Sequence, residues 1–112
     1  MTDLCTVYVT YPNEDTALSI SKLLVQQKLV ACANILPEII SLYEWKGEVV
    51  HETETAVLYK TDKCLFEPLN AYLNRHHPYD VVCCVLWSVE QSDPLYDQWV
   101  TQTINASDNN KN

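Results

Sequence analysis

Histidine and cysteine side chains gather in the segment LNRHHPYDVVCC, residues 73–84. His76 and His77 are adjacent, and Cys83 and Cys84 follow shortly after a Pro-Tyr pair. Imidazole and thiolate are ligands that copper and zinc favour in proteins, so the segment has the composition of a metal site. Whether these groups can meet depends on the elements that carry them.

A second group of polar side chains lies in residues 48–60, where Glu48, Glu52 and Glu54 share strand parity. Lys60 follows six residues after Glu54, and residues six apart in a strand share a face. Glu54 and Lys60, beside aromatic rings, indicate either a polar cleft for a small ligand or an ion pair at an interface. Glu48 and Glu52 fit the solvated face of an exposed strand.

The N-terminal elements follow from hydrophobic periodicity. Cys5, Val7 and Val9 alternate with more polar residues, which predicts a strand. Asn13 is a suitable N-cap for a helix that runs to about Gln27. The inward face of this helix is expected to hold Ala17, Ile20, Leu23 and Leu24.

Residues 30–61 are rich in Val, Ile, Thr, Tyr and Trp and predict a long hairpin. Its turn is expected at Lys46-Gly47, because Gly47 is the chain's only glycine and adopts turn conformations easily. Pro37 cannot donate a ladder hydrogen bond, so it marks a bulge or an edge in the first arm. Each arm would be about 14 residues long, well beyond the usual five or six.

The second half of the chain predicts a helix, a strand and a final helix. Pro68 delays the regular part of the first of these helices, and Pro78 ends it. The apolar run over 80–89 is typical of a strand buried on both faces. Asp93-Pro94 is a strong start for a short helix, and a flexible polar tail is expected over 106–112. One face of the first of these helices should carry Leu65, Leu69, Tyr72 and Leu73. One stripe of the final helix should carry Tyr96, Trp99, Val100 and Thr103.

The predicted order is β-α-β-β-α-β with an added short C-terminal helix. This order is the split βαβ arrangement of a ferredoxin-like α+β fold with a long central hairpin. The length of 112 residues fits a single domain, which we place at residues 1–105.

These elements change the interpretation of the His-Cys segment. Neighbouring residues on a helix diverge by about 100°, so His76 and His77 form either a ligand pair or one solvent-facing and one helix-capping side chain. Adjacent residues of a strand point to opposite faces, so Cys83 and Cys84 are expected to be buried, inert thiols. The same is expected of Cys5, Cys32 and Cys64, with Cys32 the best placed to line a cleft between subunits.

Composition narrows the function classes. The formal charge of −8 argues against nucleic-acid binding, and a membrane span of roughly 20 apolar residues is not expected. The segment MTDLCTVYVTY lacks the basic region of a signal peptide, which favours the cytoplasm. No nucleophile–base signature or phosphate-binding glycine loop is found, so an enzyme is the least expected class.

The long hairpin predicts self-association. An arm of that length reaches roughly 45 Å, beyond the roughly 35 Å diameter of a domain of this size. The tip would therefore project from the body with Tyr43, Trp45, Val49 and Val50, and an exposed apolar ribbon favours pairing with other copies. The alternative is a hairpin bent over its own sheet.

Five motifs together resemble the CutA divalent-cation tolerance proteins from Val7 to about Asn105. The motifs are QKLVACANILP, SLYEWKGEV, ETETAVLYKT, HHPY and YDQWV. The resemblance implies a ferredoxin-like fold, a tight homotrimer, a link to tolerance of copper and other divalent cations, and no enzymatic reaction.

Residue by residue, the resemblance implies a metal role for His76 and His77, with Cu²⁺ as the expected ion. It also implies a cleft between subunits, built from Cys32, Tyr43, Trp45, Glu54, Lys60 and Tyr79. Two positions depart from the family pattern. Val9 stands where the family has a first-strand cysteine, and Cys83 replaces an acidic residue after HPY.

The leading hypothesis is therefore a homotrimeric, cytoplasmic, copper-binding protein of metal tolerance. The second hypothesis is a trimeric module, similar to PII signalling proteins, that binds a small ligand in its intersubunit clefts. The third is a purely structural assembly protein. The protein partner and any small-molecule ligand stay open.

Overall fold

The computed structural model describes the backbone of residues 3–111 and the side chains of residues 3–105. It contains four strands, three α-helices and one short 3-10 turn in this part of the chain. In order, these are β1 (Leu4–Tyr11), α1 (Glu14–Gln26), β2 (Cys32–Trp45), β3 (Glu48–Asp62), the 3-10 turn (Lys63–Leu65), α2 (Phe66–His76), β4 (Cys84–Ser88) and α3 (Pro94–Lys111).

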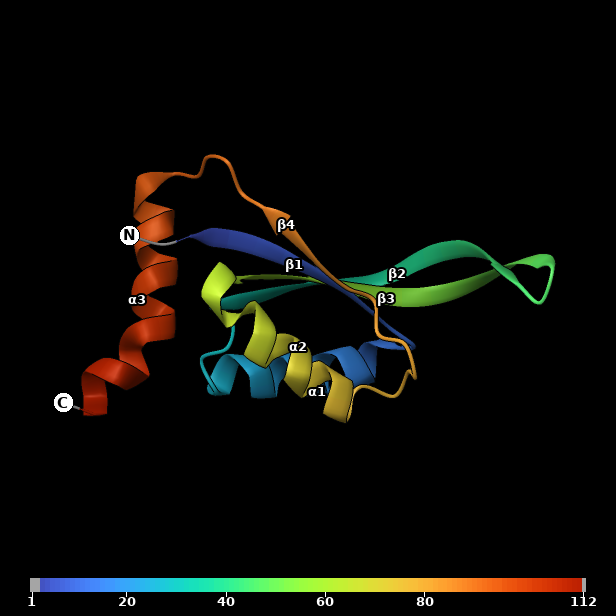
Figure 1. The fold of residues 1–112 in the computed structure, drawn as a ribbon, viewed down its shortest axis with the longest axis horizontal. Coiled ribbons are helices and arrows are strands. Elements are labelled where there is room, and N and C mark those ends of the chain that lie inside the picture. The colour runs from blue at the N-terminus through green and yellow to red at the C-terminus, as the bar shows by residue number, and fades with distance from the viewer. Residues whose placement is uncertain (1–2, 112) are drawn as a thin grey trace.

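The strands form one antiparallel sheet in the order β2-β3-β1-β4. Helices α1 and α2 lie together on one face of this sheet (Figure 1). The element order and the sheet topology confirm the predicted ferredoxin-like α+β fold. The opposite face, which we call the open face, is covered by a helix only at one end, where Val100 and Ile104 of α3 pack against Leu4.

The core lies between the sheet and these two helices. Cys5, Val7 and Val9 are fully buried, which confirms the predicted alternation in β1. Asn13 caps α1 as predicted, because its side chain accepts a hydrogen bond from the Thr16 amide at 2.8 Å. Leu23 was predicted to face inward, and this was wrong, since Leu23 is 43% exposed and Ser21 takes the inward place one turn after Ala17.

Three hydroxyl groups form a chain inside this core. The Tyr59 hydroxyl lies 2.7 Å from Ser21 Oγ and 2.5 Å from the Tyr11 hydroxyl. Burial raises the pKa of both tyrosines, so the phenols stay protonated. Helix α1 is therefore tied to β3 and β1 by polar contacts as well as by packing.

The hairpin projects well beyond the helices (Figure 1) and gives the molecule a longest extent of 53 Å. Lys46 and Gly47 form its turn, both with positive φ, as in the tight turns that match strand twist. Pro37 was predicted to mark a bulge or an edge, and both hold, because the pairing register shifts between Leu36 and Ile39 and β2 is an edge strand. This bulge places Cys32, before it, and Tyr43, after it, on the same face of β2.

Helix α2 confirms the delayed start predicted from Pro68. Residues 63–65 form a 3-10 turn capped by Asp62, whose Oδ1 accepts from the Cys64 amide at 2.8 Å. Regular helix then begins at Phe66, so Pro68 lies in the first turn, where it removes no helical hydrogen bond. Leu69, Tyr72 and Leu73 are buried as predicted.

Strand β4 differs from the prediction of a strand buried on both faces. It is shorter, lies at the sheet edge, and leaves Val85 45% and Trp87 48% exposed on the open face. Trp87 stacks on Tyr8, with ring centroids 5.3 Å apart. An apolar run does not say which molecule covers the strand. It is expected for a strand buried within its own chain, and equally for one whose second face is covered by another molecule.

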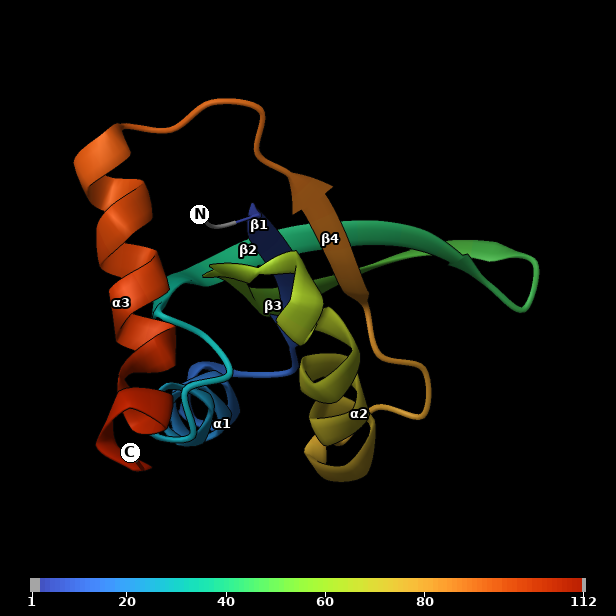
Figure 2. The same ribbon diagram turned by 60° about the vertical axis from the view of Figure 1, so that its left-hand side comes forward.

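Helix α3 crosses the end of the sheet opposite the hairpin tip (Figures 1 and 2). Asp93 caps it as predicted, accepting from the Leu95 and Tyr96 amides. Val100 and Ile104 pack against Leu4 and Ala31, whereas Tyr96 and Trp99 of the predicted stripe are 36% and 45% exposed. Helical backbone continues through most of the predicted tail. Side chains after Asn105 lie outside the described residues, so the flexibility of the tail stays a prediction.

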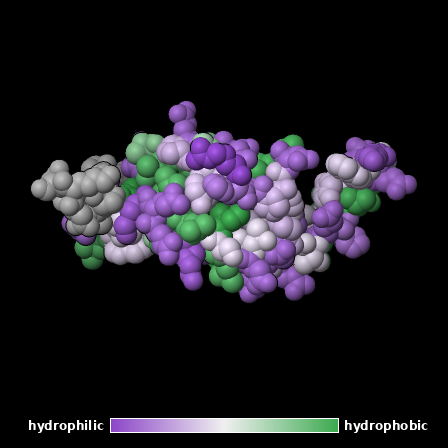
Figure 3. Space-filling model, turned by 90° about the horizontal axis from the view of Figure 1, so that it is seen from below, coloured by the Kyte–Doolittle hydropathy of each residue, from purple (hydrophilic) through white to green (hydrophobic). Residues whose placement is uncertain are grey.

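Seen from the side of α1 and α2, the surface mixes hydrophilic and hydrophobic residues, and the projecting hairpin carries both kinds (Figure 3). No helix within residues 3–111 is long and apolar enough to cross a membrane.

Candidate functional site

His77 begins the loop between α2 and β4, and both of its ring nitrogens have a partner. Nε2 donates to the Thr10 carbonyl at 2.7 Å, and Nδ1 accepts from the Tyr79 amide at 3.1 Å. A carbonyl can only accept and an amide can only donate, so these two partners fix the neutral Nε2-protonated tautomer. The ring therefore has no free lone pair for an ion in this arrangement.

Aromatic packing holds His77 in the same place. Its ring lies 4.8 Å from the Tyr11 ring and 4.7 Å from the Tyr79 ring, between centroids. Burial lowers the pKa of His77, and this effect exceeds the opposing effects of the Thr10 hydrogen bond and the Glu54 charge. The neutral imidazole is a structural link between β1 and the loop.

His76 differs from its neighbour. It is the last residue of α2, is exposed to solvent, and packs against Tyr72 with ring centroids 4.2 Å apart. The structure thus places one histidine in solvent and the other in the interior. Within the described residues, no three His, Cys, Asp or Glu side chains gather closely enough to hold a metal ion.

Four of the six predicted cleft residues lie together at the base of the hairpin tip. Tyr43 and Trp45 from β2, Glu54 from β3 and Tyr79 from the α2–β4 loop line one groove of about 870 Å³. The loop approaches the hairpin where Tyr79 meets Glu54, and Figure 1 shows it running from α2 to β4 beside the start of the projecting arms. We call this hollow the aromatic groove.

Two tyrosines donate hydrogen bonds to carboxylates in the aromatic groove. The Tyr79 hydroxyl donates to Glu54 Oε2 at 2.7 Å, and the Tyr43 hydroxyl donates to Glu52 Oε1. Burial and then the bond to Glu54 raise the pKa of Tyr79, while the bond to Glu52 is the main cause that raises the pKa of Tyr43. Both phenols therefore stay protonated and hold the carboxylates in place.

The other two predicted cleft residues lie elsewhere. Cys32 and Lys60 are directly opposite each other in the β2–β3 ladder, near α3. Cys32 Sγ lies 3.5 Å from the Tyr96 hydroxyl, whose pKa is raised to about 12 by burial and then by this contact. Lys60 Nζ donates to Asn34 Oδ1. Glu54 and Lys60 share a face but are roughly 20 Å apart along β3, so they form no pair within one chain.

All five cysteines were predicted to be buried, but only Cys5 is, and Cys32, Cys83 and Cys84 are half-buried. Burial raises the pKa of both Cys5 and Cys84 to about 11, as expected for inert thiols. Cys84 packs against the core and Cys83 precedes β4, so they do not face each other. Cys64 was predicted to be buried, and this was wrong, because it lies exposed in the 3-10 turn, where its hydrogen bond with Asp62 is the main cause that raises its pKa.

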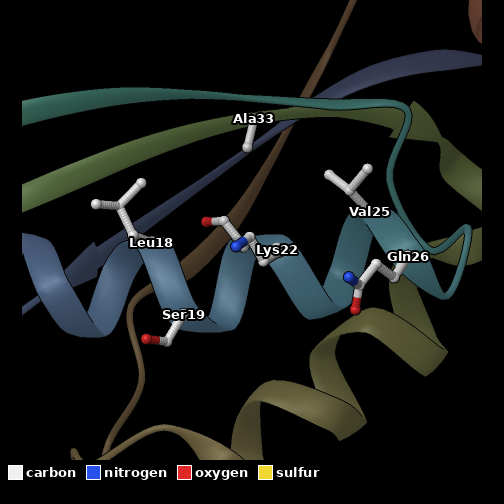
Figure 4. A pocket seen from close by; sticks show the side chains of 7 residues that line it. Leu18, Ser19, Lys22, Val25, Gln26 and Ala33 are labelled. Carbon is white, nitrogen blue, oxygen red and sulfur yellow. The ribbon is translucent and has the colours of Figure 1, made fainter.

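A second hollow of about 500 Å³ lies between α1 and β2. Figure 4 shows Leu18, Lys22 and Val25 of α1 beside Ala33 of β2. Its lining is aliphatic apart from short hydroxyls, one amide and the Lys22 ammonium, so it has neither metal ligands nor a nucleophile–base pair.

Glu52 is exposed, as predicted for the solvated face of the arm, but it also lines the aromatic groove, where its carboxylate accepts a hydrogen bond from Tyr43. This second role was not predicted. Two signals could have indicated that Glu52 lines the groove. It has the same strand parity as Glu54, and it lies opposite Ser41, next to Tyr43 on the same face. Thr10 was also missed, because a backbone carbonyl that binds His77 leaves no trace in residue type.

Comparison with known proteins identifies a family. Residues 5–103 match the family model described as CutA1 divalent ion tolerance protein. The mouse protein named "Protein CutA" is 37% identical over 102 residues, which are 91% of this chain but 58% of the mouse protein. A Xenopus laevis homologue is 40% identical and is covered to 67%. The chain thus spans little more than half of the mouse relative.

Other relatives are matched over nearly their whole length. The Thermus thermophilus divalent-cation tolerance protein CutA is 36% identical, with 86% of this chain and 93% of that protein covered. Among solved structures, CutA1 from Ehrlichia chaffeensis has a TM-score of 0.89 at 32% identity, covering 93% of this chain and 97% of that one. The Archaeoglobus fulgidus protein, named periplasmic, has a TM-score of 0.87 at 29% identity, covering 90% and 98%.

Proposed function

The chain is a member of the CutA1 divalent ion tolerance protein family, and from this premise we propose that it is a homotrimer that binds divalent cations, copper foremost, and contributes to metal tolerance. The observation that carries the proposal is the family match over residues 5–103, together with the shared fold. Because the family names describe tolerance and not a reaction, we propose that the protein acts by binding and not by catalysis.

Self-association is supported by what one chain leaves open. Both sheet edges, β2 and β4, lack a partner strand in the described chain, and Val85 and Trp87 are half exposed on the open face. A sheet edge and an apolar face are costly to leave in water. The separation of Cys32 and Lys60 from the aromatic groove gives a further reason, since another copy could bring the two halves of the predicted cleft together.

For the metal, we propose that His76 and His77 contribute to copper binding, as the family resemblance implies. His76 is exposed and accessible, whereas His77 would have to release the Thr10 carbonyl or the Tyr79 amide before it could bind an ion. Further ligands would come from other copies or from solvent. Copper heads the affinity order for imidazole sites, so His76 suits it.

Isothermal titration with Cu²⁺ tests this site. The variants His76→Ala and His77→Ala should each weaken binding, with the larger loss at the exposed His76. His51→Ala is the matched control, because it removes the third histidine of the chain from the hairpin. The histidine site is wrong if the double variant binds copper like the wild type, or if His51→Ala causes the same loss.

A second candidate function is a trimeric module that senses a small molecule in its clefts. The aromatic groove is the observation that favours it, because rings and carboxylates converge there in a hollow large enough for a small molecule. The protein partner of such a module stays open.

The cytoplasmic location also stays a prediction, and fractionation with an antibody would test it.

A further inference from the structure

We propose that His77 binds Cu²⁺ or Zn²⁺ through Nδ1, and that this binding displaces Tyr79 and frees the Glu54 carboxylate on the hairpin. The inference rests on the proposed copper site, because it names the ligating atom and the residue that controls access to it. It needs no empty groove on the open face, since the contacts that change are all made within one chain.

The two ring nitrogens of His77 are not equivalent as metal ligands. Nε2 carries the proton and donates to the Thr10 carbonyl at 2.7 Å, whereas Nδ1 carries the lone pair and accepts from the Tyr79 amide at 3.1 Å. A metal-ligating histidine almost always donates its other N–H to a carbonyl, a carboxylate or water, which fixes the ring. The bond to Thr10 already supplies this support, so Nδ1 is the nitrogen suited to bind an ion.

Binding through Nε2 would disturb more of the structure. The ring proton would have to move to Nδ1, where it would point at the N–H group of Tyr79, and the bond to the Thr10 carbonyl would be lost. Two donors would then face each other without an acceptor, which is costly in a buried place. Binding through Nδ1 breaks only the longer of the two hydrogen bonds and keeps the tautomer.

Tyr79 connects Nδ1 of His77 with the hairpin. Its amide occupies this nitrogen, its ring lies 4.7 Å from the imidazole between centroids, and its hydroxyl donates to Glu54 Oε2 at 2.7 Å. His77 is buried, so an ion reaches Nδ1 only where Tyr79 gives way. Because one residue makes all three contacts, we expect a shift that uncovers Nδ1 to pull the hydroxyl away from Glu54 as well.

The loop that carries Tyr79 is weakly held. Pro78, Asp80 and Val81 are exposed, Val81 to 87%, and Tyr79 itself is half-buried. Within the described residues, only the two hydrogen bonds of Tyr79 tie residues 78–83 to the rest of the chain. Segments with so few bonds open at a low cost in free energy. The loop can therefore rearrange while the bond between His77 and Thr10 keeps the imidazole in place.

The consequence is a link between the ion and the hairpin. Without an ion, the Tyr79 hydroxyl occupies Glu54 Oε2, and with an ion at Nδ1 this carboxylate is released. A group that binds the freed carboxylate, such as Lys60 of another copy in the proposed trimer, would strengthen metal binding by the same factor by which the metal strengthens that contact. Tyr79 is a positioning residue, since it acts on the ion through His77.

The first test is an NMR titration of the ¹⁵N-labelled full chain with Zn²⁺, which is diamagnetic. Two-bond ¹H–¹⁵N spectra of the His77 ring should show the Nδ1 signal shifting while the proton stays on Nε2. The Tyr79 amide should exchange faster with solvent at saturation. The Leu95 amide is the control, because it also donates to a side chain, Asp93 at 3.0 Å, but lies in α3, at the end of the sheet opposite the hairpin tip (Figure 1).

Two matched variants test the bond to Glu54. Tyr79→Phe keeps the ring and the amide but removes the hydroxyl, so Cu²⁺ binding should tighten roughly 3- to 30-fold, because the bond to the carboxylate no longer opposes it. Tyr43→Phe removes the equivalent bond between a phenol and Glu52, and should change Cu²⁺ binding less. A residue that only stabilised the fold would not tighten metal binding when its hydroxyl is lost.

The proposal is overturned if Zn²⁺ leaves the ring signals of His77 unchanged or moves the proton to Nδ1. It is also overturned if the Tyr79 amide is unchanged at saturation, or if Tyr79→Phe and Tyr43→Phe bind Cu²⁺ with equal affinity. Any of these results, together with Cu²⁺ binding that is lost in His76→Ala, defeats this inference and leaves copper binding at His76 standing. A wild-type protein that binds no Cu²⁺ defeats both.

Discussion

At the residue scale, His77 shows what composition can and cannot reveal. The HHPY motif identified an important loop, but the partner that holds the imidazole is the carbonyl of Thr10, 67 residues away in the sequence. Backbone carbonyls look alike in every residue type, so neither the burial of His77 nor its tautomer could be predicted. The divergence of adjacent helical residues argued against both rings holding one ion, and His76 and His77 do lie apart, in solvent and in the interior.

His77 should make the stability of the protein depend on pH. Burial lowers its pKa in the folded state, so below its unfolded value of about 6.5 the unfolded chain takes up a proton that the folded chain resists. Stability is therefore complete above about pH 6.5 and falls as the pH drops below it. Urea unfolding between about pH 7.5 and 5.5, in metal-free buffer, should show a smaller loss for His77→Gln than for the wild type.

His76→Gln is the control for this pH effect, because it removes the neighbouring, exposed imidazole. Its pH dependence should follow that of the wild type. An equal change in both variants would contradict the assignment of the effect to the buried ring.

The hydroxyl chain of Ser21, Tyr59 and Tyr11 supports a second prediction at this scale. Tyr59→Phe removes its central member and leaves two buried hydroxyls without that partner. The free energy of unfolding should fall by about 1–3 kcal/mol in urea. Tyr72→Phe, which removes a hydroxyl that makes no hydrogen bond in the described chain, should cost less; an equal cost would show that the chain adds nothing.

At the element scale, the hairpin was the most predictable part of the chain. Its length, its turn and its bulge followed from β-branched residues, the single glycine and Pro37, because each of these limits the backbone locally. Strand β4 was less predictable, since an apolar run does not say which molecule covers it. The same holds for the stripe of α3 with Tyr96 and Trp99, because its apolar character does not say whether this chain or another copy covers it.

Two substitutions in the hairpin turn should change the stability of the protein in opposite directions. Gly47 has φ of +83°, and a Cβ added there would meet no atom within 4 Å, so Gly47→Ala should cost only the backbone strain of about 1–2 kcal/mol. Lys46 has φ of +51°, where Asn is favoured, so Lys46→Asn should raise stability slightly. Thermal unfolding at one protein concentration measures both, and a stabilising Gly47→Ala would contradict the turn geometry.

At the scale of the whole molecule, a single chain leaves its surface incomplete. The hairpin projects from the body, both sheet edges are unpaired in the described chain, and the residues of the predicted cleft lie at two distant places. The sequence indicated the first of these from strand length alone. The wide separation of Glu54 and Lys60 could also have been read from the sequence, because six residues along a strand span roughly 20 Å.

A charge on the open face should separate assembly from folding. Val85 is 45% exposed in one chain, so Val85→Glu should leave the monomer folded while placing a charge in the proposed contact between copies. Leu18→Glu, at a similarly exposed position on the helical side, is the matched control. Size-exclusion chromatography with light scattering should show a smaller species for Val85→Glu only, and identical behaviour of the two variants would contradict this role of the open face.

Sedimentation equilibrium of the unmodified protein tests most directly whether copies of this chain complete one another. We expect a single species with three times the 12.9 kDa mass of one chain, unchanged on dilution into the micromolar range. A species of 12.9 kDa under the same conditions would contradict the trimer, and with it the cleft built from Glu54 of one copy and Lys60 of another.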